Sequence, residues 1–333
     1  MKAVGFTTDD PESLVDFEMA APRPGPQDLL VKIKAVALNP LDVRLRATVK
    51  TPLTHPRILG WDAAGIVEDM GAEVEDFQLG DAVYYAGSTG RPGCNSELHV
   101  VDASLVARKP AALDWSGAAA LPLTALTAWE AFFERLAISR SGRDVEKTIL
   151  ILGGSGGVGS IGIQLAKWAG LTVATTAGAD ALEWCRTLGA DHAIDYSLPL
   201  LDSLHYLGIK QVDYAVNFID TDKYWPLLCE ITRPLGKMLT IVDGAAPLDM
   251  NLMKAKSLTF TWEFVFTKIN YPDKNAVSHG NILAEIAQLV DHGKLRTTLT
   301  RRLGKINAAN IRGGHELIAS GHTIGKLALE GWN

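Results

Sequence analysis

The sequence predicts an α/β protein in which a doubly wound parallel sheet is joined to a smaller, barrel-like β domain. Residues 1–101 consist of short strand-like runs separated by Gly and Pro turns, which is typical of a small β barrel. From Thr148 onward, apolar runs alternate with amphipathic segments, as in a parallel sheet with crossover helices. A glycine-rich turn joins the first of these runs to the segment that follows it.

The composition excludes several classes of protein. Of the 333 residues 47% are hydrophobic and 21% charged, which is ordinary for a globular chain that buries a large core. A net charge of −6 gives no electrostatic basis for nucleic acid or anionic membrane as the main partner. No stretch has the pattern of a signal peptide or a membrane span. The scattered Cys94, Cys185 and Cys229 suggest reduced thiols, so we expect a cytoplasmic protein.

The barrel-like domain is expected to come first. Its predicted strands cover 2–6, 28–38, 65–69, 81–85 and 96–101. A helix with few charges should follow at about 114–136, and Pro122 inside it should kink or break it.

Residues 147–177 are the stretch around which the rest of the chain is organised. They predict a strand at 148–152, a glycine turn, a helix at 158–169 and a second strand at 171–176, which together form a βαβ unit. Glycines in this pattern permit a tight turn, the approach of a pyrophosphate and close packing of helix on strand. The unpaired N–H groups at the helix start attract the phosphate. The alternative is a plain strand-to-helix turn.

Three of these glycines, Gly154, Gly156 and Gly159, fit the pattern G-x-G-x-x-G. The predicted dinucleotide contacts of the turn are Gly153, Gly154, Ser155, Gly156, Gly157, Val158 and Gly159.

The end of the second strand bears on which dinucleotide binds. NAD sites usually carry an acidic residue there, for the ribose hydroxyls. This chain has Thr175 and Thr176, and no acid before Asp180. A missing carboxylate removes repulsion of a 2′-phosphate, and threonine hydroxyls can hydrogen-bond it. We therefore expect NADPH rather than NADH, with Thr175 and Thr176 as contacts.

The remaining segments complete the predicted sheet and its helices. Strands are expected at 192–195, 212–218 and 237–242, with helices at 181–188 and 224–232. Helices at 281–291 and 310–320 and strands at 295–299 and 325–330 finish the chain.

An aromatic run at 257–267 should form the outermost strand of the sheet. An uncovered edge of this kind invites pairing with another chain. The simplest solution is a two-fold homodimer in which strand 257–266 of each subunit pairs antiparallel.

Several local motifs, in this order, resemble those of the medium-chain dehydrogenase/reductase superfamily. They are NPLD at 39–42, GWDAAG at 60–65, LGDAV at 79–83, ALPLTALTAW at 120–129 and GKLAL at 325–329. Within that superfamily the chain looks like the quinone oxidoreductase branch, and most like the group labelled zinc-type alcohol dehydrogenase-like. The resemblance implies a Rossmann domain at 124–267 and a GroES-like substrate domain built from 1–123 and the returning tail 268–333.

The residues do not supply a zinc site of the kind found in some members of this superfamily. A catalytic zinc needs three ligands from Cys, His or a carboxylate. Where the resemblance places the first ligand the chain has the loop 39–42, and where it places the second it has Trp61. Segment 86–96 holds only Cys94, too few for a structural zinc lobe. Asp42 and Asp62 alone make a poor zinc site, so we expect no metal and a structural hydrogen bond for Asp62.

Without zinc, the favoured chemistry is hydride transfer from NADPH to a quinone or an α,β-unsaturated carbonyl, whose oxygen takes up the negative charge. The protein then needs a hydrogen-bond donor for that oxygen. Asn39 is one candidate; the alternative is that it caps the helix after Pro40. Tyr84 or Tyr85 is another, and only one of them can face the cleft because side chains alternate along a strand. Trp61 is a candidate pocket wall, or simply a core residue.

The resemblance places Asn39 near the nicotinamide and Thr127 beside its amide. Phe218, which ends a predicted strand, and Lys326 of the GKLAL motif complete the candidate cofactor contacts. Two alternatives stand beside the reductase: a zinc-dependent alcohol dehydrogenase, and a nucleotide-binding protein with a structural or regulatory role and little turnover.

Overall fold

The structure is a computed structural model that describes residues 1–273 and 276–332. The chain divides into two compact units. The first unit comprises Met1–Leu126 together with Phe266–Asn333, and the second unit comprises Thr127–Val265. Among the helices of the described residues, none has the length and apolar character needed to cross a lipid bilayer.

The second unit is a parallel six-stranded sheet with the strand order β11-β10-β9-β12-β13-β14. The chain runs outward from β9 in one direction and returns to continue from β12 in the other, so the order reverses between these two strands. In open α/β sheets ligands bind at such a switch point, beyond the carboxyl ends of the strands. The strands are β9 (Thr148–Leu152), β10 (Thr172–Ala177), β11 (His192–Asp195), β12 (Val212–Asn217), β13 (Thr232–Thr240) and β14 (Thr259–Trp262).

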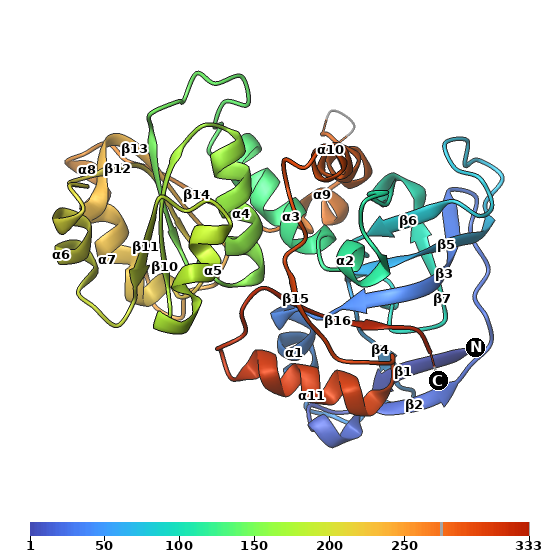
Figure 1. Ribbon diagram of the computed structural model, residues 1–333. Coiled ribbons are helices and arrows are strands. Elements are labelled where there is room, and N and C mark those ends of the chain that lie inside the picture. Colours follow the sequence, from blue (N-terminus) through green and yellow to red (C-terminus); the bar gives the residue numbers. More distant parts are fainter. Residues whose placement is uncertain (274–275, 333) are drawn as a thin grey trace. The chain divides into compact units, whose positions relative to one another are not determined.

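Helices cover both faces of this sheet, which explains why its central strands are continuous apolar runs. Figure 1 shows α4 and α5 on one side and α6, α7 and α8 on the other. They are α4 (Gly157–Trp168), α5 (Leu182–Thr187), α6 (Leu200–Tyr206), α7 (Thr221–Ile231) and α8 (Asn251–Lys254), with the short helix η4 (Ala179–Ala181) before α5. The predicted doubly wound sheet is thus confirmed.

The first unit is built around a seven-stranded sheet in the order β15-β16-β3-β5-β6-β8, with β7 also paired to β3. A separate sheet has the order β2-β1-β4. The strands are β1 (Lys2–Phe6), β2 (Val15–Glu18), β3 (Asp28–Ala37), β4 (Arg57–Ile58), β5 (Ala63–Met70), β6 (Ala82–Tyr85), β7 (Leu98–Asp102), β8 (Val106–Arg108), β15 (Leu299–Arg302) and β16 (Lys326–Glu330). Strand β16 therefore brings the end of the chain back beside β3.

The helices of the first unit lie around these sheets. They are α1 (Pro40–Ala47), α2 (Trp115–Ala119), α9 (Thr267–Asn270), α10 (His279–Asp291) and α11 (Ala308–Ala319), with the short helices η1 (Pro11–Ser13) and η2 (Ala103–Leu105). The single helix predicted at 114–136 is broken, as expected for Pro122: α2 ends at Ala119, and α3 (Pro122–Trp129) continues into the π-helix η3 (Glu130–Arg135).

The predicted outermost strand is in the right place but shorter than expected. Strand β14 is the last in the order of its sheet, and it ends at Trp262 rather than Thr267. Val265 and Phe266 are both buried, which strict alternation along an edge strand does not allow, and they lie in a turn.

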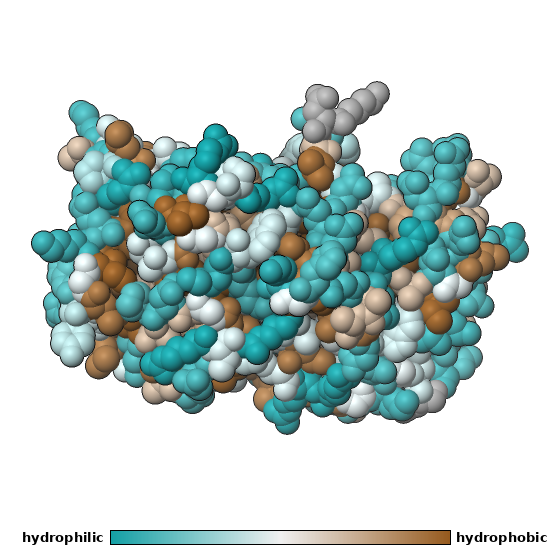
Figure 2. Space-filling model, turned by 45° about the horizontal axis from the view of Figure 1, so that its top comes forward, coloured by the Kyte–Doolittle hydropathy of each residue, from teal (hydrophilic) through white to brown (hydrophobic). Residues whose placement is uncertain are grey.

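The surface is that of an ordinary globular protein. On the face that Figure 2 shows, hydrophilic side chains predominate and hydrophobic ones are scattered among them in small groups.

Candidate functional site

The glycine turn after β9 has open space beside one glycine and none beside two others. A Cβ on Gly154 would lie 2.0 Å from the hydroxyl oxygen of Thr175, and one on Gly159 would lie 2.1 Å from the carbonyl oxygen of Gly153. These two glycines are therefore required by packing. A Cβ on Gly156 would meet nothing closer than 3.6 Å. Gly153 has a φ of +90°, which favours glycine at that position of the turn.

Gly156 is the N-cap of α4, so the open space lies at the start of that helix. The N–H groups of the first helical turn have no acceptor within the helix, and together with the helix dipole they attract an anion. Gly157, Val158 and Gly159 supply these N–H groups. The turn thus has the geometry that a pyrophosphate requires.

The two threonines at the end of β10, which were predicted as cofactor contacts, have hydroxyl groups that form hydrogen bonds within the fold. Thr175 and Thr176 are both buried. The hydroxyl of Thr175 donates to the carbonyl of Ile151 at 2.7 Å, and the hydroxyl oxygen of Thr176 accepts from the N–H of Gly153 at 3.1 Å. Adjacent strand residues face opposite sides of a sheet, and both sides of β10 are covered. The threonines shape the turn.

Two groups that sequence reasoning passed over lie at the end of β10. A Cβ on Gly178 would come within 2.8 Å of the Asp180 carboxylate and 3.4 Å of the Tyr196 hydroxyl. Tyr196 is 47% exposed. Gly178 starts η4, which folds Asp180 back toward the strand end. In the sequence, Gly178 directly after the strand was the signal that could have predicted a turn bringing Asp180 back to the strand end.

Phe218 lies beside the glycine turn, and Thr127 lies buried in α3. The N–H of Phe218 donates to the carbonyl of Leu152 at 3.2 Å, and its Cβ is 3.9 Å from where a Cβ on Gly153 would lie. Phe218 therefore stands at the switch point between β9 and β12. Thr127 is a buried residue of α3. Ser155, half-buried, accepts the hydroxyl of Ser160 on its carbonyl at 3.2 Å.

The first unit holds a buried polar cluster of three side chains. The Lys326 ammonium donates to the carbonyl of Leu38 at 2.8 Å, to the amide oxygen of Asn39 at 2.5 Å and to a carboxylate oxygen of Asp62 at 2.8 Å. The Asn39 amide nitrogen donates to the same oxygen of Asp62 at 2.9 Å. The other oxygen of Asp62 accepts the N–H of Leu123 at 2.7 Å. The predicted structural hydrogen bond of Asp62 is therefore present, and Asp62 also forms an ion pair with Lys326 that was not predicted.

A second buried carboxylate, Asp42, supports the loop that carries Asn39. It accepts the N–H of Asn39 at 2.7 Å and the N–H of Gly60 at 3.1 Å. Burial raises the pKa of Asp42 to about 7. Burial also raises the pKa of Asp62, and the Lys326 charge opposes that shift. Asn39 is the N-cap residue of α1, where it forms a capping box with Asp42, and its side-chain amide is also hydrogen-bonded to Lys326 and Asp62.

The cluster shows what Lys326, predicted as a cofactor contact, binds within the protein. All three of its ammonium hydrogens have acceptors within the first unit, and the side chain is buried. Lys326 therefore holds Asn39 and Asp62 together. The sequence showed the lysine but not its partner, which lies 264 residues away.

The same residues do not fit a zinc ion. Both oxygens of Asp62 are already used, one of them by an ammonium group that would repel a cation. Trp61 offers no ligand atom, and Cys94 is a buried thiol whose pKa is raised by burial. Within the described residues, no three His, Cys, Asp or Glu side chains lie close enough together to hold a metal.

Both tyrosines of β6, of which Tyr84 was the predicted donor, have hydroxyl groups that are hydrogen-bonded within the first unit. Both rings are fully buried. The Tyr84 hydroxyl donates to the carbonyl of Leu283 at 2.6 Å, and the Tyr85 hydroxyl pairs with His99 at 2.8 Å. These hydroxyls tie β6 to α10 and to β7.

Trp61 and Asn95 are the buried side chains whose polar atoms remain without partners in this region. Trp61 is 1% exposed, and within the described residues its indole N–H has no acceptor. Both polar atoms of the Asn95 amide are likewise unpaired, and a Cβ on Gly60 would lie 2.6 Å from its oxygen. Buried donors without partners are rare and call for an explanation such as a bound ligand. Asn95 was not among the predicted residues.

A doubly wound sheet with a phosphate-accepting turn, together with a barrel-like unit that carries buried polar groups, defines a nucleotide-binding oxidoreductase of the alcohol dehydrogenase type. The family model described as "Alcohol dehydrogenase GroES-like domain" matches residues 25–111, and "Zinc-binding dehydrogenase" matches residues 188–329. A zinc-type alcohol dehydrogenase-like protein of Staphylococcus epidermidis is 36% identical over 335 residues, covering 99% of each chain. A chloroplastic quinone-oxidoreductase homolog of Spinacia oleracea is 33% identical over 327 residues, covering 96% of this chain and 94% of the relative. The chain belongs to the medium-chain dehydrogenase/reductase superfamily, in its quinone oxidoreductase-like branch.

Solved structures agree with this assignment. An alcohol dehydrogenase superfamily protein from Novosphingobium aromaticivorans superposes with a TM-score of 0.87 at 30% identity, covering 99% of this chain and 98% of that chain. The Escherichia coli quinone oxidoreductase complexed with NADPH superposes with a TM-score of 0.84 at 24% identity, covering 99% of this chain and 100% of that chain. The second likeness supports the fold alone.

Proposed function

We propose that the protein is an NADPH-dependent, zinc-independent reductase of quinones or α,β-unsaturated carbonyl compounds. The observation that carries the proposal is the Lys326–Asp62–Asn39 cluster, which uses Asp62 in an ion pair within a fold whose glycine turn is intact. A cytoplasmic location and a homodimer paired through β14 belong to the same proposal.

The nucleotide would be held by the turn Gly153–Gly159 and by the start of α4. When bound, its nicotinamide supplies a hydride. The residues of the first unit then have to orient the acceptor and stabilise negative charge on its oxygen, since the part of the chain that the structure describes offers no cluster of metal ligands to serve as Lewis acid.

Two groups of the first unit suit this task. One hydrogen of the Asn39 amide nitrogen goes to Asp62, and the other makes only a 3.5 Å contact with the carbonyl of Ala37. The buried indole N–H of Trp61 has no acceptor among the described residues. Lys326 and Asp62 fix the Asn39 amide so that its nitrogen is the donor.

The first experiment is an assay of NADPH oxidation with a panel of quinones, enones and enals, on protein dialysed against a chelator. Turnover with these acceptors, unchanged by the chelator, is expected. Activity that is lost on dialysis and restored by zinc would favour an alcohol dehydrogenase. Binding of NADPH without turnover on any acceptor would favour a structural or regulatory role.

A pair of variants tests the donor. Trp61→Phe removes the indole N–H together with part of the ring volume, and it should lower kcat about 10²–10³-fold with little change in KM, as loss of an oxyanion donor does elsewhere. Tyr84→Phe is the matched control, since its hydroxyl is committed to Leu283. If the two variants had equal kcat, Trp61 would not be the donor.

The preference for NADPH rests on the absence of an acid on β10 itself. The Asp180 carboxylate lies close to Gly178, just beyond the strand end, and it should oppose a 2′-phosphate. NADPH should bind more tightly than NADH, and Asp180→Asn should widen the difference. Asp202→Asn, on exposed α6, is the control. Tighter NADH binding by the wild type would overturn the preference.

A further inference from the structure

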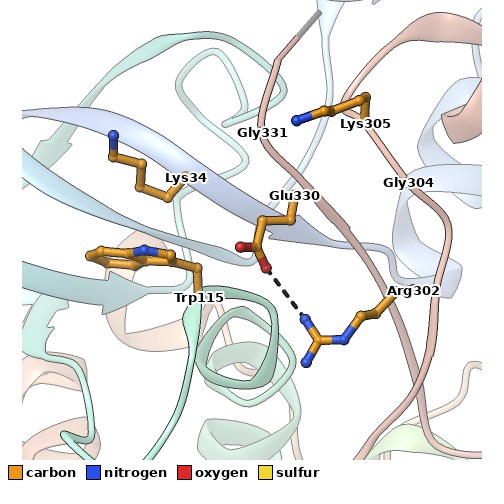
Figure 3. A pocket seen from close by; sticks show the side chains of 7 residues that line it. All are labelled: Lys34, Trp115, Arg302, Gly304, Lys305, Glu330 and Gly331. Atoms are coloured by element: carbon orange, nitrogen blue, oxygen red, sulfur yellow. Dashed lines mark hydrogen bonds and ion pairs between the residues drawn. The ribbon is translucent and has the colours of Figure 1, made fainter.

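The first unit contains a cavity of about 410 Å³ that has its own polar lining. Its walls include Lys34 of β3, Trp115 of α2, Arg302 of β15 and Glu330 of β16. Lys305, which lies in the loop after β15, also lines it. Figure 3 shows Lys34 and Trp115 on one side of Glu330 and Lys305 on the other. The volume lies within the range of about 300–1,000 Å³ typical of small-molecule sites. The lining belongs to the first unit alone, whereas the glycine turn belongs to the second.

Arg302 and Glu330 form a fixed polar frame in this cavity. One guanidinium nitrogen of Arg302 lies 3.3 Å from the Glu330 carboxylate, and another lies 2.6 Å from Asp114. Glu330 also accepts the N–H of Ser116 at 3.3 Å and the Ser116 hydroxyl. These charges are therefore largely satisfied by their neighbours.

The two lysines are not satisfied in this way. Within the described residues, neither Lys34 nor Lys305 has a hydrogen bond or ion pair from its ammonium group. Three cations against one carboxylate give the lining a net charge of +2, in a protein whose net charge is −6. The unpaired charge of the cavity thus comes from two ammonium groups on separate segments.

Gly331 lies beside one of these ammonium groups, and its backbone conformation favours glycine. A Cβ on Gly331 would lie 2.9 Å from the Lys305 ammonium nitrogen, and Gly331 has a φ of +75°. Any other residue there would be strained and would displace Lys305.

Trp115 gives the cavity a flat, apolar wall. The indole is half-buried, and the Lys109 ammonium lies 5.4 Å from its ring centroid, which helps to hold it in place. A planar group of a ligand can stack on such a ring, while its charged end reaches the lysines.

We propose that this cavity binds a small dianion attached to a flat organic group, of the chemical class of an aryl phosphate. The two ammonium groups, one on each side of Glu330, supply positive charge for a phosphate monoester, and Trp115 supplies a flat surface for its ring. A ligand seated there would contact both β3 and β16, the strands that lead to Asn39 and carry Lys326.

The test is calorimetric titration of the full-length protein with phenyl phosphate, in the presence of saturating NADPH so that the glycine turn is already filled. Saturable binding of one phenyl phosphate per chain is expected, weakening as salt is raised. Lys34→Gln and Lys305→Gln should each weaken it about tenfold, the loss of one charge-assisted contact. Lys294→Gln, an exposed lysine of the same unit, should leave it unchanged.

Trp115→Leu and inorganic phosphate test the aromatic part. Wild-type protein should bind phenyl phosphate at least about tenfold more tightly than inorganic phosphate, and Trp115→Leu should remove that difference. The proposal fails if phenyl phosphate does not saturate, or if both lysine variants, folded by circular dichroism, bind it as the wild type does. Equal binding of the two probes by the wild type would refute the aryl class.

Discussion

At Gly156 the turn leaves room for a ligand, whereas Gly154 and Gly159 are required by packing. Gly156→Val should abolish most of the NADPH affinity while the protein stays folded, because the new side chain enters open space at the start of α4. Fluorescence titration and a thermal melt measure the two quantities. Gly154→Val is the contrasting variant, since its Cβ would lie 2.0 Å from Thr175 and should destabilise the fold itself. Normal NADPH binding by Gly156→Val would show that the turn joins β9 to α4 without binding the pyrophosphate.

Lys326 tests the energetics of a buried ion pair. Lys326→Met should cost about 3–5 kcal/mol in the free energy of unfolding, because it leaves the Asp62 carboxylate buried without its cation. Lys50→Met, which breaks the exposed pair with Asp9, should cost about 0–1 kcal/mol. Urea denaturation measures both. Equal losses of unfolding free energy in the two variants would show that the Asp62 carboxylate gains another partner or becomes protonated.

At the scale of elements, an ion pair joins the π-helix η3 to the residue after β14. Arg135 lies 2.9 Å from Glu263 and 3.8 Å from Glu130. Both carboxyl groups are buried, and the charges of Glu130 and Glu134 act on Glu263. Burial, together with the neighbouring Glu130, raises the pKa of Glu263 from its ordinary 4.5 to about 8.

This pair predicts a pH dependence of stability. Between about pH 4.5 and 8 the folded protein holds a proton on Glu263 that the unfolded chain has lost, so stability falls as the pH rises through that window. Glu263→Gln should flatten this slope, as measured by urea unfolding at several pH values. Glu230→Gln, on the exposed side of α7, should keep it. An unchanged slope in Glu263→Gln would show that the carboxyl pair does not titrate there.

The edge strand β14 carries the prediction about assembly. Trp262 is 45% exposed and Phe264, just beyond the strand, 52% exposed, next to an edge of the sheet that no strand of the described residues pairs with. We expect a homodimer, and Trp262→Lys should dissociate it, since charge on an edge strand blocks pairing. Light scattering is the measurement. Tyr206→Lys, at an aromatic residue that is 92% exposed on α6, is the control. A monomeric wild type would refute the proposed pairing.

At the scale of the whole molecule, the alternation of strand and helix predicted the second unit well because its signals are local. The strand at 192–195 was placed correctly, and the break at Pro122 was anticipated. Helix α6 was missed, because Leu200–Tyr206 is short and begins after a proline without a capping side chain.

The site was harder to predict because its contacts join distant parts of the chain. A glycine pattern specifies a turn within a few residues, so Gly156 could be singled out. The burial of Thr175, Thr176 and Tyr84 depends on which faces of a strand are covered, which one sequence does not show. The partner of Lys326 depends on β16 lying beside β3, a pairing of segments almost 300 residues apart.

That pairing bears on the order in which the molecule forms during synthesis. The second unit is one continuous segment, Thr127–Val265, and can close as soon as it has left the ribosome. The first unit has to wait for β16, which follows the whole second unit in the chain, to complete its sheet and to neutralise Asp62. Until then β3 lacks its partner β16, and contacts of such long range are slow to form. From the synthesis of β3 until that of β16 the first unit therefore stays incomplete, and this is the interval in which a chaperone would find it.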